Sequence, residues 1–496
     1  WPVSLLVSGP ILLPLLAAAL SIGVGRWRNA QRVIGVVTLT VVSGLSAALL
    51  VRVDEDGPRV VQAGGWPAPV GITLVADRLS AMMLVVSVLV LLAVLVFAIG
   101  QPGAEEDHVG FHPIYLILSA GVANAFLTGD LFNLFVAFEM TLMSSYVLLS
   151  LGGRADQVRS AMTYVVISLL ASVLFLLALA YVYAATGTVN LADLSVRIAD
   201  LPSGVRSGLA LLLIVVFGIK AAIFPLFFWL PDSYPTAPTP VTAVFAGLLT
   251  KVGVYALLRS QTLLFPADTR PGTLLLVVAA LTMIVGGLGA ITQNDIKRIL
   301  SFHIVSQIGY MVMGLGLFTV GGLTAAVLYT VNQIVVKATL FLVAGLIEVR
   351  AGTGKLAELT GLRRLEPLLA VLFLLPALSL AGIPPFSGFV TKLALVEAGL
   401  DASEYAVVAA ALAASLLTLF SMTKIWANTF WGPNPTDDPG RPLSSRRRAL
   451  MVAPTAALVG LGLAIAVLAG PIYALSERAA EDLADPSGYV AEVLAP

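Results

Sequence analysis

The chain has 496 residues, of which 58% are hydrophobic and 11% are charged, and its formal net charge at pH 7 is zero. The mean hydropathy is +0.97. Soluble domains carry about 25% charged residues, so this composition excludes a soluble globular protein and indicates an integral membrane protein. The lack of cysteine excludes disulfides, thiolate iron–sulfur ligation and zinc ribbons, and three histidines are too few for a histidine-rich metal site.

Motifs for redox cofactors and nucleotides are also missing. No glycine-rich dinucleotide fingerprint follows a strand, and no GxxxxGK[ST] loop occurs. We therefore predict no cofactor, and neither a cation site nor a metal ligand set follows from the sequence.

Apolar segments long enough to cross a bilayer recur along the whole chain, since about 20 residues suffice. We predict an all-α membrane protein of about fourteen spans, with these approximate bounds: Val3–Ile22, Val33–Val51, Leu79–Ile99, Phe111–Leu127, Leu131–Leu151, Ala161–Ala185, Gly208–Leu230, Val241–Leu258, Leu274–Ile291, Ile299–Phe318, Leu323–Val349, Leu368–Leu395, Tyr405–Thr423 and Leu450–Tyr473. The polar stretch after them, 476–496, is expected to be a solvated surface helix, with a docking tail as the alternative.

The loops between these spans differ in charge. Loops after odd-numbered spans hold more than twice as many Lys and Arg residues as loops after even-numbered spans, where Arg259 is counted. Short translocated loops avoid these residues. Both termini are therefore predicted to lie outside the cytoplasm.

Prolines interrupt two of the spans. Pro225 follows Lys220 in the seventh, and Pro384 and Pro385 precede Lys392 in the twelfth. Proline removes a backbone donor and clashes with the preceding turn, so both helices should break at membrane depth. Paired broken helices in two halves of a transporter point to inverted repeats.

We accordingly predict two inverted repeats of five helices. The predicted regions are 1–110 with three spans, 111–260 with the first repeat, 272–425 with the second, 449–475 with the last span, and the tail 476–496.

Ionisable residues lie inside these spans. Burying an ammonium in hydrocarbon costs roughly 2.5 to 3.5 kcal/mol even on the permissive insertion scale, so such residues face protein or water and mark ion paths. The candidates are Glu139, Lys220, Lys251, Lys337 and Lys392, with His303 near a span end.

Four ordered motifs then resemble a known family. They are GDLFNLFVAFEMTLMSSYVLLSL around Glu139, GIKAAIFPLFFWLPDSYPTAPTPVTAVFAGLLTKVGVY around Lys220 and Lys251, QNDIKRILSFHIVSQIGYM around His303, and LSLAGIPPFSGFVTK around Lys392. They look like the antiporter-like subunits shared by respiratory complex I, membrane-bound hydrogenases and Mrp-type cation/proton antiporters. The length and the lysines at 251 and 392 are most similar to the D-type subunits of Mrp antiporters.

This resemblance implies a role for each charged residue. Glu139 would pair with Lys220, and a displaced partner would let the lysine lose its proton. Lys251 and Lys337 would continue a hydrated axis at mid-membrane. His303, with Ser306 and Gln307, would fill the gap in this axis, and Lys392 would lie at its far end.

The function that follows is a proton-translocating membrane subunit of a multi-subunit Na⁺/H⁺ antiporter in the bacterial cell membrane. It would be a secondary transporter subunit and not an enzyme, with other membrane subunits as partners and sodium passing at least partly elsewhere. A proton-pumping subunit of a complex I-like oxidoreductase or membrane-bound hydrogenase is the alternative, and a structural scaffold is the third.

Each candidate also has a purely structural interpretation. Glu139, Lys220 and Lys392 would then be satisfied buried charges, and Lys251 and Lys337 would be packing lysines, Lys251 a snorkelling one. His303 would cap or pack beside the nearby loop. The charges in all five span-centre positions are intact, which favours a function.

Overall fold

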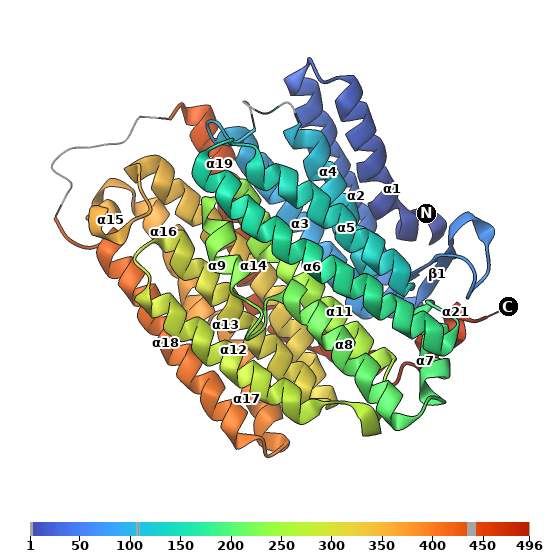
Figure 1. Cartoon of the computed structure of the whole chain (residues 1–496). Coiled ribbons are helices and arrows are strands. Elements are labelled where there is room, and N and C mark those ends of the chain that lie inside the picture. The colour runs from blue at the N-terminus through green and yellow to red at the C-terminus, as the bar shows by residue number, and fades with distance from the viewer. Residues whose placement is uncertain (1–2, 106–107, 109, 434–442, 496) are drawn as a thin grey trace.

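The computed structural model describes residues 3–105, 108, 110–433 and 443–495, and they form a helical bundle (Figure 1). Its N-terminal part consists of α1 (Val3–Gly23), α2 (Arg28–Asp56), β1 (Arg59–Gln62), η1 (Ala63–Gly65), β2 (Thr73–Ala76) and α3 (Arg78–Gly100). The two strands pair antiparallel, with Arg59 opposite Ala76. This hairpin between α2 and α3 is a small addition to the all-α prediction.

The next part of the chain contains the first broken helix. Its elements are α4 (Phe111–Leu127), α5 (Leu131–Ser150), α6 (Ala155–Thr186), α7 (Leu191–Ala199), α8 (Ser203–Ala221), α9 (Trp229–Ser233), η2 (Tyr234–Thr236), α10 (Thr239–Val244), the π-helical η3 (Phe245–Leu249) and α11 (Thr250–Leu263).

The second broken helix lies in the remainder. Its elements are η4 (Ala267–Thr269), α12 (Gly272–Thr292), α13 (Ile296–Leu317), α14 (Val320–Ala351), η5 (Leu356–Glu358), α15 (Leu362–Leu365), α16 (Pro367–Ala381), α17 (Ser387–Asp401), α18 (Tyr405–Thr429), α19 (Ser445–Val467), α20 (Ala469–Ala484) and α21 (Ser487–Val493).

Both predicted breaks are confirmed, and they are alike. The residue that caps the C-terminus of α8 is Ala222 with φ 62°, and the one that caps α16 is Gly382 with φ 82°. A left-handed residue stops the helix because the next backbone N–H turns back onto the last carbonyls. Proline follows three residues later in each case, at Pro225 and Pro385.

Further elements repeat between the two halves. Helices α6 and α14 both have 32 residues, and each ends at a left-handed glycine, Gly187 or Gly352. Asp130 caps α5 and Asp295 caps α13, each accepting a hydrogen bond from the backbone N–H three residues on. Five-helix repeats give such pairs of matching elements.

Eleven helices of the described chain are long and apolar enough to cross a membrane, and Phe111–Leu127 and Pro367–Ala381 are shorter apolar helices. The chain is a multi-pass membrane protein. The number of fourteen spans stays a prediction. The N- and C-terminal ends lie at the same end of the bundle, near β1 and α21 (Figure 1).

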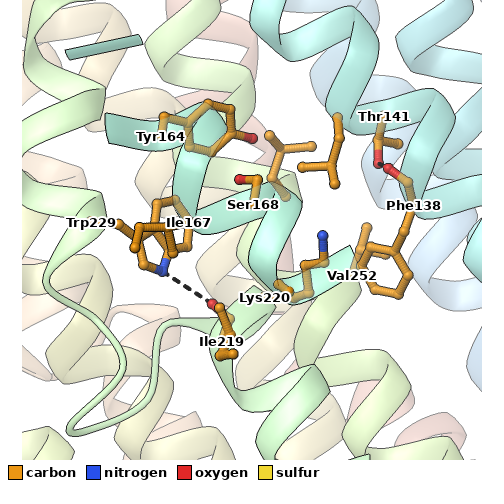
Figure 2. Close-up of a pocket in the computed structure, with 12 residues that line it drawn as sticks. Phe138, Thr141, Tyr164, Ile167, Ser168, Ile219, Lys220, Trp229 and Val252 are labelled. Atoms are coloured by element: carbon orange, nitrogen blue, oxygen red, sulfur yellow. Dashed lines mark hydrogen bonds between the residues drawn. The ribbon is translucent and has the colours of Figure 1, made fainter. Parts of the chain in front are cut away.

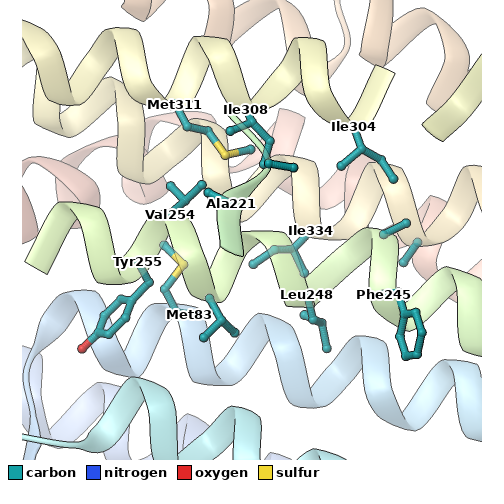
Figure 3. Packing of buried hydrophobic residues seen from close by; sticks show 14 of the residues in the cluster. Met83, Ala221, Phe245, Leu248, Val254, Tyr255, Ile304, Ile308, Met311 and Ile334 are labelled. Atoms are coloured by element: carbon teal, nitrogen blue, oxygen red, sulfur yellow. The ribbon is translucent and has the colours of Figure 1, made fainter. Parts of the chain in front are cut away.

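The innermost helices carry three of the candidate residues, Lys251, His303 and Lys337. We compare the share of buried residues in the most apolar stretch of each segment. This share is 100% in Thr239–Leu263 and 94% in α13, but only 33% in α2 and in α19. Figure 3 shows side chains of α3, α11, α13 and α14 meeting in one apolar cluster, among them Met83, Val254 and Ile308. Lipid therefore cannot reach the centre of the bundle.

Near α21 the structure corrects the expectation for Arg259 and shows what the polar tail contacts. Arg259, counted as a loop residue, is buried in α11, where it pairs with Asp77 at 2.6 Å. The polar tail docks on its own chain: Asp482 pairs with Arg78 at 2.9 Å, Arg478 pairs with Asp54 at 2.7 Å, and the Tyr489 ring lies 5.2 Å from the Arg259 guanidinium.

Candidate functional site

The first pair of predicted residues comes from α5 and α8, with α6 between them. Ser172 of α6 donates a hydrogen bond to Glu139, and Lys220 Nζ donates to Ser172 Oγ at 3.5 Å. No direct ion pair between Glu139 and Lys220 is formed within the described residues. The carboxylate and the ammonium are therefore joined through a hydroxyl.

A small cavity of about 30 Å³ lies beside Lys220. Figure 2 shows the ammonium pointing among residues of α5 and α6, including Phe138 and Ser168. A water molecule needs about 10 to 15 Å³ of this space, so the cavity is large enough to hold water. Trp229 Nε1 donates to the Ile219 carbonyl at 3.1 Å, which ties the segment after the break to the last turn of α8.

Glu139 also faces outward. Its side chain is half-buried and borders an apolar groove of about 470 Å³ between α4 and α5, lined by Ile117, Val136 and Met140 among others. A carboxylate at this depth is costly against lipid tails.

Lys251 lies two residues after the end of the π-helical segment. Its ammonium, with 1% of the residue exposed, donates to the Ala246 carbonyl inside that segment. A π-helical turn frees backbone carbonyls from the regular ladder, and such turns often occur at functional sites. The local irregularity thus supplies the acceptor that a buried lysine needs.

The centre of the bundle holds many buried polar atoms that lack a protein partner. Within the described residues, no hydrogen bond reaches His303 Nδ1 and Nε2, Gln307 Nε2, Asn332 Nδ2, Gln333 Oε1 and Nε2, or Lys337 Nζ. They all come from α13 and α14. Buried polar groups are nearly always paired with protein or ordered water, so this row fits a file of water molecules.

Other polar side chains here are paired. Tyr329 donates to Gln307, and Ser387 donates to Asn332 at 2.7 Å. Ser306, which was expected to face the path, instead donates to the Met283 carbonyl of α12 at 2.9 Å. It holds two helices together and does not join the row.

Lys392 lies just after the second break. Its Nζ donates to the Leu380 carbonyl at 2.9 Å and stands 4.9 Å from the Tyr310 ring centroid. Tyr310 in turn donates to the Ala411 carbonyl at 2.7 Å. The cation is thus stabilised by an orphan helix-end carbonyl and an aromatic face.

Electrostatic proximity links the predicted residues into two groups. Lys220 interacts with Glu139. Lys337 interacts with both Lys251 and Lys392, and His303 interacts with Lys337 and Lys392. The structure therefore brings the second group together around α13 and α14.

Sequence reasoning missed several members of this site. Ser172 is one of many serines in apolar helices, and nothing in the sequence marks it. Asn332 and Gln333 were detectable, since two adjacent amides in an apolar span cost free energy unless they are hydrogen-bonded. Among the described residues, no group of His, Asp and Glu is placed to hold a metal ion.

Three comparisons with known proteins agree. The family model described as "NADH:quinone oxidoreductase/Mrp antiporter, TM" matches residues 128–418, a range that contains all six predicted site residues. The D-type Na(+)/H(+) antiporter subunit of Alkalihalophilus pseudofirmus is 44% identical over 99% of both chains. That of Bacillus subtilis is 35% identical over 98% of both.

The chain belongs to this antiporter family. A solved chain of the Mrp complex from Dietzia sp. DQ12-45-1b has a TM-score of 0.93 at 36% identity, covering 99% of both chains. A chain of the archaeal membrane-bound sulfane sulfur reductase has a TM-score of 0.91 at 27% identity, again over 99% of both. The family's membrane subunit thus occurs in complexes of different kinds.

Proposed function

We propose that this chain is the D-type, proton-translocating subunit of a multi-subunit Na⁺/H⁺ antiporter. The observation that carries the proposal is the set of buried lysines together with the unpaired polar atoms on α13 and α14. The names of its relatives in Alkalihalophilus and Bacillus support the cation and the exchange. The predicted repeat bounds, 111–260 and 272–425, belong to this proposal.

The proposed path runs from Glu139 to Lys392. An ionised Glu139 stabilises the Lys220 ammonium, and when that contact weakens, Lys220 releases its proton toward Lys251. The titrations of neighbouring lysines are coupled, because moving one charge changes the proton affinity of the next. Lys337 and His303 continue the path.

We place the subunit in the bacterial cell membrane, with both termini outside the cytoplasm and other membrane subunits as partners. The groove at Glu139 supports such partners, because protein cover removes a carboxylate from lipid. A sodium ion prefers oxygen ligands, whereas this axis is mostly cationic, so sodium crosses at least partly elsewhere.

A test uses inverted vesicles from a strain without its own Na⁺/H⁺ antiporters that expresses the whole operon. Sodium-dependent proton release, followed by dye dequenching, should disappear in Glu139→Ala, Lys220→Ala and Lys392→Ala while the complex still assembles. Wild-type exchange in all three assembled variants would refute the path.

The second candidate is a proton-pumping subunit of a redox complex. The similarity to a chain of the sulfane sulfur reductase favours it. No sodium response, together with loss of NADH-driven pumping in the Lys392 variant, would move the protein to this candidate.

A further inference from the structure

Ser172 stands between the two charges that begin the path. Its hydroxyl donates to Glu139 and accepts from Lys220 Nζ at 3.5 Å. A serine hydroxyl has one donor and two acceptor sites, so it can hold a carboxylate and an ammonium at once. Ser172 is 6% exposed, so bulk water does not compete freely for either bond.

One other buried hydroxyl on α6 behaves differently, whereas the Tyr164 hydroxyl also bonds to another helix, at 2.9 Å from Ser145 Oγ of α5. Thr186, also buried, donates to the Val182 carbonyl of its own helix at 2.7 Å. A hydrogen bond to the carbonyl four residues earlier is common for a Ser or Thr hydroxyl inside a helix. Ser172 instead uses its donor on a side chain of another helix, and that side chain is the Glu139 carboxylate.

The repeat relation gives a second, independent argument. Ser172 is the eighteenth residue of α6, and Lys337 is the eighteenth residue of α14; both lie fifteen residues before the left-handed glycine that ends the helix. The first repeat thus has a hydroxyl where the second has one of the lysines of the central row. The equivalent place in both halves is occupied by a group that exchanges protons or hydrogen bonds.

We infer that Ser172 relays the proton between Lys220 and Glu139, an inference that rests on the proposed function. In one concerted step an N–H bond of the ammonium breaks and its proton goes to Ser172 Oγ. The original Ser172 O–H bond breaks and its proton goes to the Glu139 carboxylate. The products are a neutral amine, an intact hydroxyl and a neutral carboxyl group, so protons and charge balance. The same step in reverse returns the proton from Glu139 to Lys220 before Lys220 passes a proton toward Lys251.

The relay predicts that the hydroxyl matters and the shape of the side chain does not. Ser172→Thr keeps the hydroxyl, and Ser172→Val has the same shape without it. General acid–base steps contribute about 10² to 10⁴ in rate, so Ser172→Val and Ser172→Ala should lose at least about tenfold in exchange rate per assembled complex. Ser172→Thr should stay close to wild type.

Thr186→Val is the matched control, since it removes a hydroxyl from the same helix away from both charges. Rates are measured by dye dequenching in inverted vesicles across pH and normalised to the assembled complex. Equal rates for the Thr and Val variants, or wild-type exchange in Ser172→Ala, would overturn the relay. If Glu139→Ala and Lys220→Ala are also active, the proposed function itself fails, so the two failures are distinguishable.

Discussion

Breaking the buried ion pair between Asp77 and Arg259 is expected to lower the free energy of unfolding by about 3 to 5 kcal/mol. The guanidinium makes two contacts with the carboxylate, at 2.6 Å and 2.8 Å, and the side chains are only 4% and 6% exposed. Removing either partner leaves an uncompensated buried charge, which explains this magnitude.

The two single variants should respond differently to pH. Burial raises the pKa of Asp77, but Arg259 and the backbone N–H of Ser80 outweigh it and hold the pKa below 3.8. In Arg259→Met burial dominates, so the pKa of Asp77 rises and protonation removes the buried charge. This variant should therefore regain stability relative to wild type as the pH falls, by about 1.4 kcal/mol for each unit of pKa shift.

Asp77→Asn leaves the guanidinium, which does not lose its proton in a protein. Its loss of stability should therefore persist at every pH. The double variant should be more stable than the sum of the single losses predicts, because both charges are gone.

Thermal unfolding of the purified complex in detergent, followed by tryptophan fluorescence at neutral and mildly acidic pH, measures all four proteins. The same pH response in both single variants would contradict this reasoning. So would a single variant as stable as wild type.

Other predictions concern Asp130, which caps the start of α5, and Gly388, which follows the second break. Burial raises the pKa of Asp130 from 3.8 to about 6, so the folded carboxyl binds its proton more tightly than the unfolded one and stability falls as the pH rises through this interval. Asp130→Asn, which still caps the helix, should be more stable by up to about 3 kcal/mol at neutral pH in thermal unfolding, and an unchanged pH profile would argue against it. Gly388→Ala would place a methyl 1.6 Å from the Ser379 carbonyl oxygen, so assembly on native gels should fail, whereas Gly460→Ala, with no atom within 4 Å, should assemble. Normal assembly of both would show that α16 and α17 do not need this close approach.

Much of the candidate site is visible in the sequence because burying a charged side chain in an apolar segment costs free energy, so such a residue points to a function. Each lysine in an apolar stretch can be recognised without knowing its neighbours in space, and so can the prolines at the two breaks. The same logic failed for Arg259, because hydropathy ends the eighth span before it and does not register that α11 continues, buried, to Leu263.

The sequence by itself determined the membrane class, the broken helices and the identity of the buried charges. Only the tertiary structure decided that Ser172 bridges Glu139 and Lys220, that Ser306 packs against α12, and that Arg259 pairs with Asp77. The physical reason is that hydrophobicity acts on each residue alone, whereas hydrogen bonds and ion pairs depend on how helices are rotated and shifted against one another.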